Sequence, residues 1–398
     1  MKKTIAKDDT TTGQGSTQIS NDAQGQIQEF IDQLIESRTE RGIQVAVYRD
    51  GDLVVDAVAG VADPATGRPV TSDTPFYNFS IVKGAASTVA HILAERGLFG
   101  YDTPVAELWP EFGAHGKRSV TVRHVLNHSA GVPGIPLDIT PEDLCDWDKM
   151  CAAIADAELW WEPGTKLGYH AYTFGYIVGE IVRRTTGKRI SQVLRDTVSG
   201  PLGVADELYF GMPESQHHRL ARLEDAESAT GPMSAMPADL PMFKSAPMTL
   251  FPTAGLGNRT DILSADIPAG GKTSARAIAR MYAALLGEVD GIRLISPERL
   301  REATAVSMSG VDAVFGMPSA WALGYSIGRL GSTPQDSPTA FGVGGAGGSF
   351  AYGDTATGIA FAVTKNRLTA DFSAATQLSQ IVDKAFSDDR SRSSKASR

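Results

Sequence analysis

The sequence is nearly without cysteine: Cys145 and Cys151 are the only two among 398 residues. So few thiols exclude a disulfide-dense secreted scaffold, and their spacing matches no metal-binding pattern. Sparing use of cysteine is typical of proteins in a reducing compartment, so we expect a cytoplasmic location and no metal. A disulfide between the two cysteines is the less favoured alternative.

Positive charge and long apolar runs are also scarce. Lysine and arginine number 37 against 46 acidic residues, a net charge of −9, which argues against nucleic acid and anionic membranes as partners. No apolar stretch approaches the roughly 20 residues of a membrane-spanning helix. The start of the chain is basic, but Asp8 and Asp9 follow where an export signal needs its apolar core. We therefore expect a small-molecule partner, and the oligomeric state stays open.

The chain is long enough to bury a large core, and its hydrophobic content of 42% is ordinary for a globular protein. Polar segments at 1–21 and 388–398 predict disordered tails. Strand patterns lie near both chain ends and helical patterns fill the middle. We expect an α/β fold of the α+β type, with a largely antiparallel sheet built from both chain ends and flanked by helices. The sheet domain would comprise 22–79 and 255–387, and an inserted, mostly helical domain would comprise 80–254.

Local patterns predict the individual elements. Strands are expected at 42–48, 53–59, 321–329, 348–352 and 358–365. The first two would be joined by a hairpin turn at Asp50-Gly51. Helices are expected at 22–38, 120–127, 141–157, 174–186, 190–198, 274–286 and 370–386. The segment 231–252, rich in proline and methionine, predicts a long loop beside a pocket.

Ser80 and Lys83 are the first candidates for chemistry. They lie where an extended aromatic segment, 74–79, turns into a helix, and no other serine has lysine three positions later. Residues three apart share a helix face, so the amine can reach the hydroxyl. Serine needs a base to become a nucleophile, and lysine can serve when burial and a helix N-terminus lower its pKa. A capping serine beside a solvated lysine is the alternative.

Two further segments can contribute to a site. Tyr169 follows the turn Pro163-Gly164 and lies 89 residues beyond Ser80. A phenol held near a cation can act as acid or base, and a buried structural phenol is the alternative. The segment 341–352 is dense in glycine, which in a strand marks the close approach of a ligand or another backbone.

Ser80-x-x-Lys83, the Pro-Gly turn with Tyr169, and the glycine-rich strand stand in the order found in serine β-lactamases and penicillin-binding proteins. The chain resembles this superfamily from about residue 22 to residue 386, and most of all class C β-lactamases and family VIII carboxylesterases. The resemblance implies Ser80 as nucleophile, Lys83 as its activator and Tyr169 as a proton relay. It also implies an oxyanion hole made by the backbone N–H groups of Ser80 and Ala346, and no cofactor.

Two departures from the family pattern bear on the substrate. Val343 stands where the family usually has lysine or histidine, and Ala171 stands where many β-lactamases have asparagine. Neither can supply a charge or hydrogen bond to a substrate carboxylate or acyl side chain. Neutral esters or amides are therefore favoured over β-lactams and peptide C-termini. The pocket is expected to include Trp161, His170, Val343, Gly344 and Gly345.

Rival motifs predict other sites less well. The segment 324–328 reads Gly-x-Ser-x-Gly, but it lies inside a strand pattern and no helix follows. Gly271-Lys272-Thr273 resembles the end of a phosphate-binding loop, yet Asp266 stands where its first glycine should be. His124 and His128 lack the glutamate of a zinc-protease pattern, and we expect ordinary hydrogen bonding for both.

The favoured function is that of a serine acyl hydrolase, a carboxylesterase acting on small neutral esters through an acyl-enzyme. A transacylase that moves the acyl group to a small alcohol or amine is an alternative, as is a weak β-lactamase or peptidase. Outside enzymes, the alternative is an acylated sensor or binding module.

Overall fold

Strands from both ends of the chain build one sheet. The computed structural model describes residues 11–227, 236–237 and 239–396, and nine strands of this part of the chain form the sheet. They are β1 (Gly42–Arg49), β2 (Asp52–Asp63), β3 (Arg68–Pro69), β8 (Met308–Val311), β9 (Pro318–Trp321), β10 (Ser326–Ile327), β11 (Ala340–Gly345), β12 (Ser349–Asp354) and β13 (Ile359–Lys365). Their order is β3-β2-β1-β13-β12-β11-β10-β9-β8, and neighbouring strands are antiparallel. The expected fold class is confirmed.

Helices separate the two groups of strands. The α-helices are α1 (Thr11–Glu36), α2 (Lys83–Glu95), α3 (Val105–Leu108), α4 (Val122–Leu126), α5 (Pro141–Leu144), α6 (Trp147–Asp156), α7 (Thr173–Thr186), α8 (Ile190–Leu194), α10 (Pro241–Ser245), α11 (Ala254–Gly257), α12 (Thr260–Ser264), α13 (Ala275–Leu286), α14 (Pro297–Thr304) and α15 (Ser373–Ala396). Shorter helical turns are η1 (Phe79–Val82), η2 (Pro110–Gly113), η3 (Lys117–Ser119), η4 (Arg195–Ser199), η5 (Glu214–Arg219) and η7 (Met248–Leu250), and the small strands are β4 (Phe76–Tyr77), β5 (Leu208–Tyr209), β6 (Glu224–Asp225), β7 (Lys272–Thr273) and β14 (Arg367–Leu368). None of the described helices has both the length and the apolar character needed to cross a bilayer.

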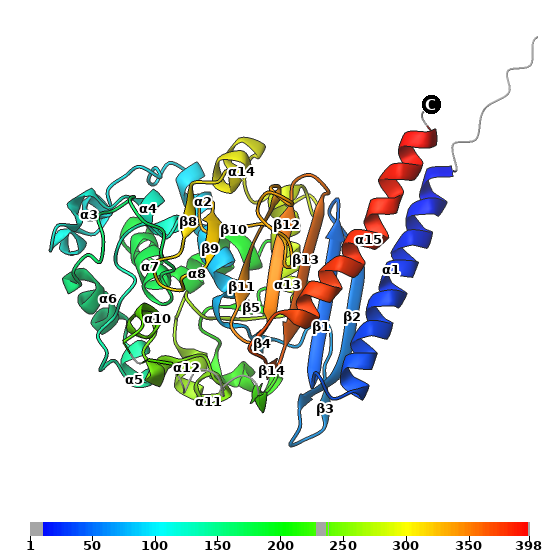
Figure 1. The fold of residues 1–398 in the computed structure, drawn as a ribbon, viewed down its shortest axis with the longest axis horizontal. Helices are drawn as coiled ribbons and strands as arrows, with labels where there is room; N and C mark the ends of the chain where they lie inside the picture. The colour runs from blue at the N-terminus through cyan, green and yellow to red at the C-terminus, as the bar shows by residue number, and fades with distance from the viewer. Residues whose placement is uncertain (1–10, 228–235, 238, 397–398) are drawn as a thin grey trace, which may run out of the picture.

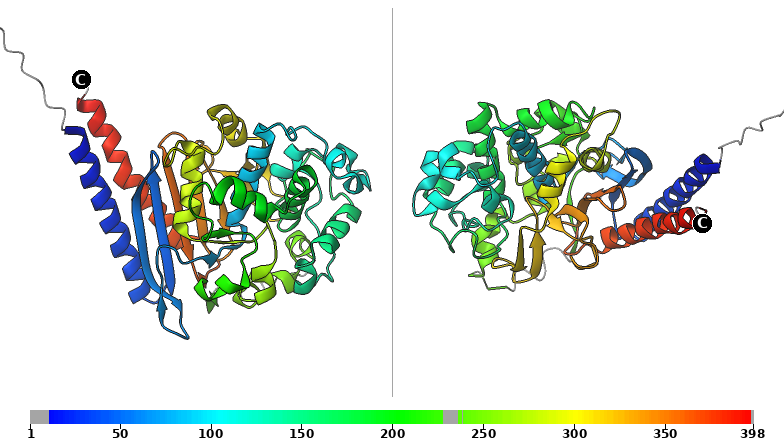
Figure 2. Two further views of the ribbon diagram at one scale, coloured as in Figure 1. Left: turned by 180° about the vertical axis from the view of Figure 1, so that it is seen from behind. Right: turned by 90° about the horizontal axis from the view of Figure 1, so that it is seen from above.

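The sheet lies between two helical layers. α1 and α15 run side by side over one face (Figure 1), where Ile27 and Ile31 pack with Val45, Val363 and Leu378 in one buried cluster. α13 covers the opposite face and packs against β1, β12 and β13. Beyond it, the helices from α2 to α12 gather on one side of the molecule (Figure 2). The division into domains at 79/80 and 254/255 stays a prediction.

The hairpin at the start of the sheet follows the sequence closely. Asp50 and Gly51 join β1 to β2 with φ angles of 51° and 94°. A two-residue turn with both φ angles positive has the twist of an antiparallel pair, and Asp-Gly is a favoured sequence for it. The predicted turn is therefore confirmed.

Three predicted segments differ from the structure. The disordered tails predicted at 1–21 and 388–398 lie partly outside the described residues, at 1–10 and 397–398. Within the described part, helices run from Thr11 to Glu36 and from Ser373 to Ala396. α1 and α15 contact each other, and tertiary contact adds to the stability that a helix gains from its own propensity. The expected strand 321–329 is two strands, because the chain reverses at Gly324, whose φ is 86°.

The predicted helix 141–157 is also divided, into α5 and α6, because the Asp146 side chain accepts a hydrogen bond from the Lys149 N–H and starts a new helix. The loop predicted at 231–252 lies partly outside the described residues. Within its described part, the chain forms α10 and η7.

A buried ion pair ties the first strand to the end of β13. Glu40 precedes β1, and its carboxylate pairs with the Lys365 ammonium, with side-chain exposures of 1% and 2%. The Lys365 Nζ also donates to the Thr369 Oγ1 at 3.0 Å. Burial raises the pKa of Glu40 and lowers that of Lys365, so each charge depends on the other.

Replacing Lys365 by methionine leaves the Glu40 carboxylate buried without its counter-charge. We expect Lys365→Met to lower the free energy of unfolding by about 3–5 kcal/mol, measured by urea denaturation. Arg301→Ala removes an exposed ion pair with Glu298 and should cost less than about 1 kcal/mol. Equal shifts in the two variants would contradict the role given to the buried pair.

Candidate active site

The turn that carries Ser80 is held from both sides. The Asn78 amide Nδ2 donates to the Thr273 carbonyl at 2.9 Å, and its Oδ1 accepts from the Ser349 hydroxyl at 3.0 Å. Phe79 has a φ of 48°, a left-handed conformation that only a well-held segment maintains. These bonds join β7 and β12 to the start of α2, so the Ser80 hydroxyl has a fixed direction.

Lys83 is buried directly beneath this serine. Its Nζ lies 2.8 Å from the Ser80 Oγ and 3.3 Å from the Ala269 carbonyl oxygen. The lysine is completely buried, whereas Ser80 is only half-buried. Burial lowers the pKa of Lys83 to about 7, because the charged form loses its hydration without gaining a counter-charge. Near neutral pH, much of the amine is therefore uncharged and able to accept the serine proton.

The Tyr169 phenol completes the group. Its ring centroid lies 5.0 Å from the Lys83 Nζ, and its hydroxyl hydrogen-bonds with Ser80. Burial raises the pKa of Tyr169 above its ordinary value, although the bond to Ser80 partly opposes the shift. The phenol is thus protonated at neutral pH and is suited to donate a proton rather than to act as a phenolate base.

The glycine-rich turn between β11 and β12 lies against the Ser80 turn. The Gly348 N–H donates to the Gly345 carbonyl at 3.2 Å, and Gly347, at the third position of the turn, has a φ of 91°. This is the position at which a type II turn needs glycine. Within the described residues, neither the Ser80 N–H nor the Ala346 N–H donates a hydrogen bond to another residue. Both N–H groups are therefore available to an acceptor, and their role as an oxyanion hole stays a prediction.

The residues predicted to line the pocket lie in two settings. His170 is fully buried, and its ring nitrogens bond the Gly168 carbonyl at 2.6 Å and the Val132 N–H at 3.2 Å. Trp161 is also buried, and its indole N–H donates to the Ser129 carbonyl. Both side chains support the Tyr169 loop, and their contact with substrate stays a prediction.

Val343 and the glycines after it lie at the end of β11, beyond the residues that pair with β10. Val343 is 1% exposed, and its Cγ2 lies 3.7 Å from the position of a Cβ on Gly84, at the start of α2. Gly344 is half-buried beside the Phe372 ring. Gly345 faces the Asn78 carbonyl so closely that a Cβ would lie 2.1 Å from its oxygen. The strand therefore approaches the Ser80 turn as the glycines predicted.

Several residues that fix the position of Ser80 and Tyr169 were not predicted from the sequence. Asn78 and Ser349 fix the Ser80 turn, and Asp312 accepts a hydrogen bond from the Tyr169 N–H at 2.9 Å. His128 was expected only to be hydrogen-bonded, and it is buried against the Tyr169 ring. Asp312 lies 143 residues from Tyr169, and no local pattern signals such a contact.

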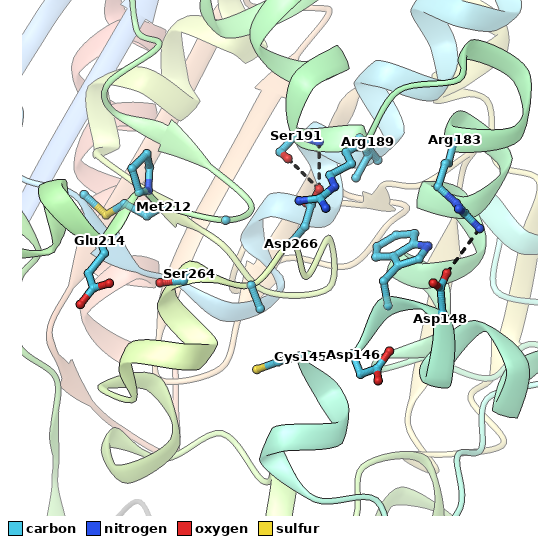
Figure 3. A pocket seen from close by; sticks show the side chains of 15 residues that line it. Cys145, Asp146, Asp148, Arg183, Arg189, Ser191, Met212, Glu214, Ser264 and Asp266 are labelled. Carbon is cyan, nitrogen blue, oxygen red and sulfur yellow. Dashed lines mark hydrogen bonds and ion pairs between the residues drawn. The ribbon is translucent and has the colours of Figure 1, made fainter.

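Rival sites lie elsewhere or lack the needed geometry. Ser326 lies in β10, where its hydroxyl donates to the Gly342 carbonyl at 2.8 Å. A cavity of about 880 Å³ lies beside α6, α8 and α12 (Figure 3), and Asp266 in its wall accepts a hydrogen bond from the Ser191 hydroxyl at 2.6 Å. Its lining includes none of Ser80, Lys83 and Tyr169. Among the described residues, no three His, Cys, Asp or Glu side chains gather as a metal site requires.

The close approach of Gly345 to Asn78 predicts a sharp difference between neighbouring glycines. We expect Gly345→Ala to reduce kcat/KM for a short ester at least about 100-fold, because the new Cβ would push β11 off the Ser80 turn and displace an oxyanion donor. In Gly344→Ala, the atoms nearest to the Cβ would be those of the Phe372 and Phe350 rings, at 3.1 to 3.3 Å. That control should lose less than tenfold (about 1.4 kcal/mol), and equal losses would count against this packing.

Comparison with known proteins places the chain among the serine β-lactamases and esterases. "Esterase/beta-lactamase LipL" of Mycobacterium tuberculosis is 38% identical over 341 residues, which cover 82% of this chain and 77% of LipL. The crystal structure of a family VIII carboxylesterase has a TM-score of 0.81 and 32% identity, and the match covers 93% of this chain and 97% of that one.

The structure of EstA from Arthrobacter nitroguajacolicus also has a TM-score of 0.81, at 27% identity, and the match covers 91% of this chain and 96% of EstA. The family model described as Beta-lactamase matches residues 27–385. The resemblance inferred from the three motifs is confirmed: the chain belongs to the Beta-lactamase family.

Proposed function

We propose that the protein is a carboxylesterase that cleaves small neutral esters through an acyl-enzyme on Ser80. The observation that carries this proposal is a buried amine, without a carboxylate partner among the described residues, 2.8 Å from a half-buried hydroxyl. Such an amine is a base near neutral pH, and such a hydroxyl can be reached by substrate.

The geometry supports a two-step reaction. In the first step, the Ser80 Oγ bonds to the ester carbonyl carbon while the neutral Lys83 amine takes its proton. The carbonyl oxygen becomes an anion that the N–H groups of Ser80 and Ala346 stabilise. Tyr169 then gives its proton to the alcohol oxygen as the carbon–oxygen bond breaks, and Lys83 returns a proton to the phenol. In the second step, a water molecule gives a proton to Lys83 and Tyr169 as its oxygen bonds to the acyl carbon. The bond to the Ser80 Oγ then breaks, the serine regains its proton, and the acid is released.

The preference for neutral substrates is supported by the residues at the end of β11 and beside Tyr169. A carboxylate needs a cation or several donors to replace its lost hydration. Val343 supplies neither, and Ala171 lacks the amide that many β-lactamases have at this point. The relative LipL is named as both an esterase and a β-lactamase, so β-lactam hydrolysis is the second candidate. Turnover of a chromogenic cephalosporin at a rate matching that of short esters would favour it.

The cellular location is proposed on separate grounds. Cys145 and Cys151 are both free thiols, which supports the cytoplasmic location expected from the cysteine count. Fractionation of the source cells would test it.

Intact-mass measurement tests the nucleophile directly. After mixing with p-nitrophenyl acetate, the wild-type protein should gain the mass of one acetyl group, and Ser80→Ala should gain none. Ser326→Ala, which removes the serine of the rival Gly-x-Ser-x-Gly segment, is the matched control and should acylate normally. An adduct that persists in Ser80→Ala, or vanishes in Ser326→Ala, would overturn the assignment.

The pH profile tests the base. Burial brings the pKa of Lys83 from 10.5 down to about 7, and only its deprotonated form can accept the serine proton. We expect kcat/KM to rise with pH along a limb of apparent pKa about 7 and to level off above it. Lys83→Arg, which stays charged, should lose at least about 100-fold at every pH. A limb near pH 10, or an active arginine variant, would show that another group is the base.

A further inference from the structure

The Tyr169 loop is held by three consecutive backbone N–H groups. The Gly168 N–H donates to the His128 carbonyl at 3.0 Å, and the Tyr169 N–H donates to the Asp312 carboxylate at 2.9 Å. The His170 N–H donates to the His128 Nδ1 at 3.1 Å. His128 thus supplies two of these three acceptors, one on each side of Tyr169.

The His128 ring also packs against the phenol. Its centroid lies 4.8 Å from that of Tyr169, 4.9 Å from that of Phe174 and 4.3 Å from that of Trp321, whose ring crosses it at 75°. The imidazole therefore fills the space between the Tyr169 ring and the start of α7. A phenol supported on its backbone and on its ring has little freedom to turn.

The protonation state of His128 suits this contact. Burial lowers the pKa of His128 well below its ordinary value, and the nearby His170 and Lys83 lower it further. The neutral ring keeps a lone pair on Nδ1 for the His170 N–H, which places its proton on Nε2. Within the described part of the chain, that Nε2 is buried and has no hydrogen-bond partner.

Histidine is costly at this position if packing is its only task. The His128 backbone has a φ of 61°, a left-handed conformation in which asparagine, aspartate and histidine are enriched among residues other than glycine. The unpartnered buried N–H costs about 1–3 kcal/mol. An apolar side chain would avoid that cost but could not accept the His170 N–H. Few other side chains could accept the His170 N–H in place of the His128 Nδ1.

From these contacts we propose that His128 is a positioning residue that aims the Tyr169 hydroxyl at the leaving-group oxygen. The inference rests on the proposed function, in which Tyr169 protonates the departing alcohol. An alkoxide leaves slowly without that proton, whereas p-nitrophenolate leaves readily without it. Loosening the Tyr169 loop should therefore harm alkyl esters far more than p-nitrophenyl esters, and a general loss of stability would harm both equally.

The test compares ethyl acetate with p-nitrophenyl acetate, which form the same acetyl-enzyme and differ only in the leaving group. His128→Phe keeps a ring but removes the acceptor, and we expect it to lower kcat/KM for ethyl acetate about 100-fold more than for p-nitrophenyl acetate. His128→Asn tolerates the left-handed backbone and places an amide oxygen near the Nδ1 position. It should restore ethyl acetate hydrolysis to within about tenfold of wild type (about 1.4 kcal/mol). Tyr169→Phe should show the same selective loss as His128→Phe.

The control is a second fully buried histidine away from Tyr169. His91 on α2 bonds the Tyr101 hydroxyl at 2.7 Å and the Leu323 carbonyl at 2.9 Å, and His91→Asn should change both esters by the same factor. If His128→Phe does not fold, His128→Gln takes its place, because its amide reaches the Nε2 position and leaves the Nδ1 position empty.

Equal loss on both esters in the His128 variants, or no rescue by asparagine, would overturn the positioning role. The proposed function fails separately, by the absence of a Ser80 acyl adduct in the wild-type protein. A wild-type protein that acylates on Ser80 while His128→Phe affects both esters alike would leave the esterase proposal standing and remove this one.

Discussion

The burial of one lysine without a counter-charge is the constraint on which the site depends. Lys83 is completely buried, and its pKa is lowered to about 7 by that burial. A carboxylate beside it would restore the charged form and remove the base. Lys272 is equally buried, with a pKa also lowered to about 7, but its ammonium donates to two backbone carbonyls. Lys365 is buried against Glu40. Of these three buried lysines in the described part of the chain, Lys83 is the one whose amine lies within hydrogen-bond distance of a serine hydroxyl.

Keeping that amine next to a reachable serine requires both halves of the molecule. The Ser80 turn leads directly into α2. The Asn78 side chain bonds this turn to β7 and, through Ser349, to β12. The opposite wall is the end of β11, which approaches within van der Waals distance only because Gly345 has no side chain. In the proposed reaction, one oxyanion donor comes from a sheet assembled from distant segments, and the other comes from the start of a helix. Ser80, the proposed nucleophile, lies where these two parts meet.

The sequence predicted what is local and missed what is distant. Ser80 and Lys83 are one helical turn apart, so their contact follows from helix geometry. The partners of the Tyr169 loop come from other parts of the chain, and the fold alone brings them together. His170 was expected to line the pocket, and its contact with substrate stays a prediction. Its ring bonds backbone groups of the supporting loops, the Val132 N–H and the Gly168 carbonyl. The sequence did not predict the turn at Gly324. Apolar and polar residues alternate on both sides of this tight turn, and such alternation predicts a single strand.

Val343 shows how packing and substrate choice are linked. Its side chain lies against Gly84, next to Lys83, in a part of the site closed to water. A cation at this position would face an uncharged lysine across a medium of low dielectric constant and would depress its pKa further. It would also offer a charge to substrate carboxylates. With valine there, burial alone sets the pKa of Lys83, and a carboxylate entering beside β11 would meet no cation from this strand position to offset its lost hydration. A neutral ester has no such penalty, which supports the proposed preference for uncharged substrates.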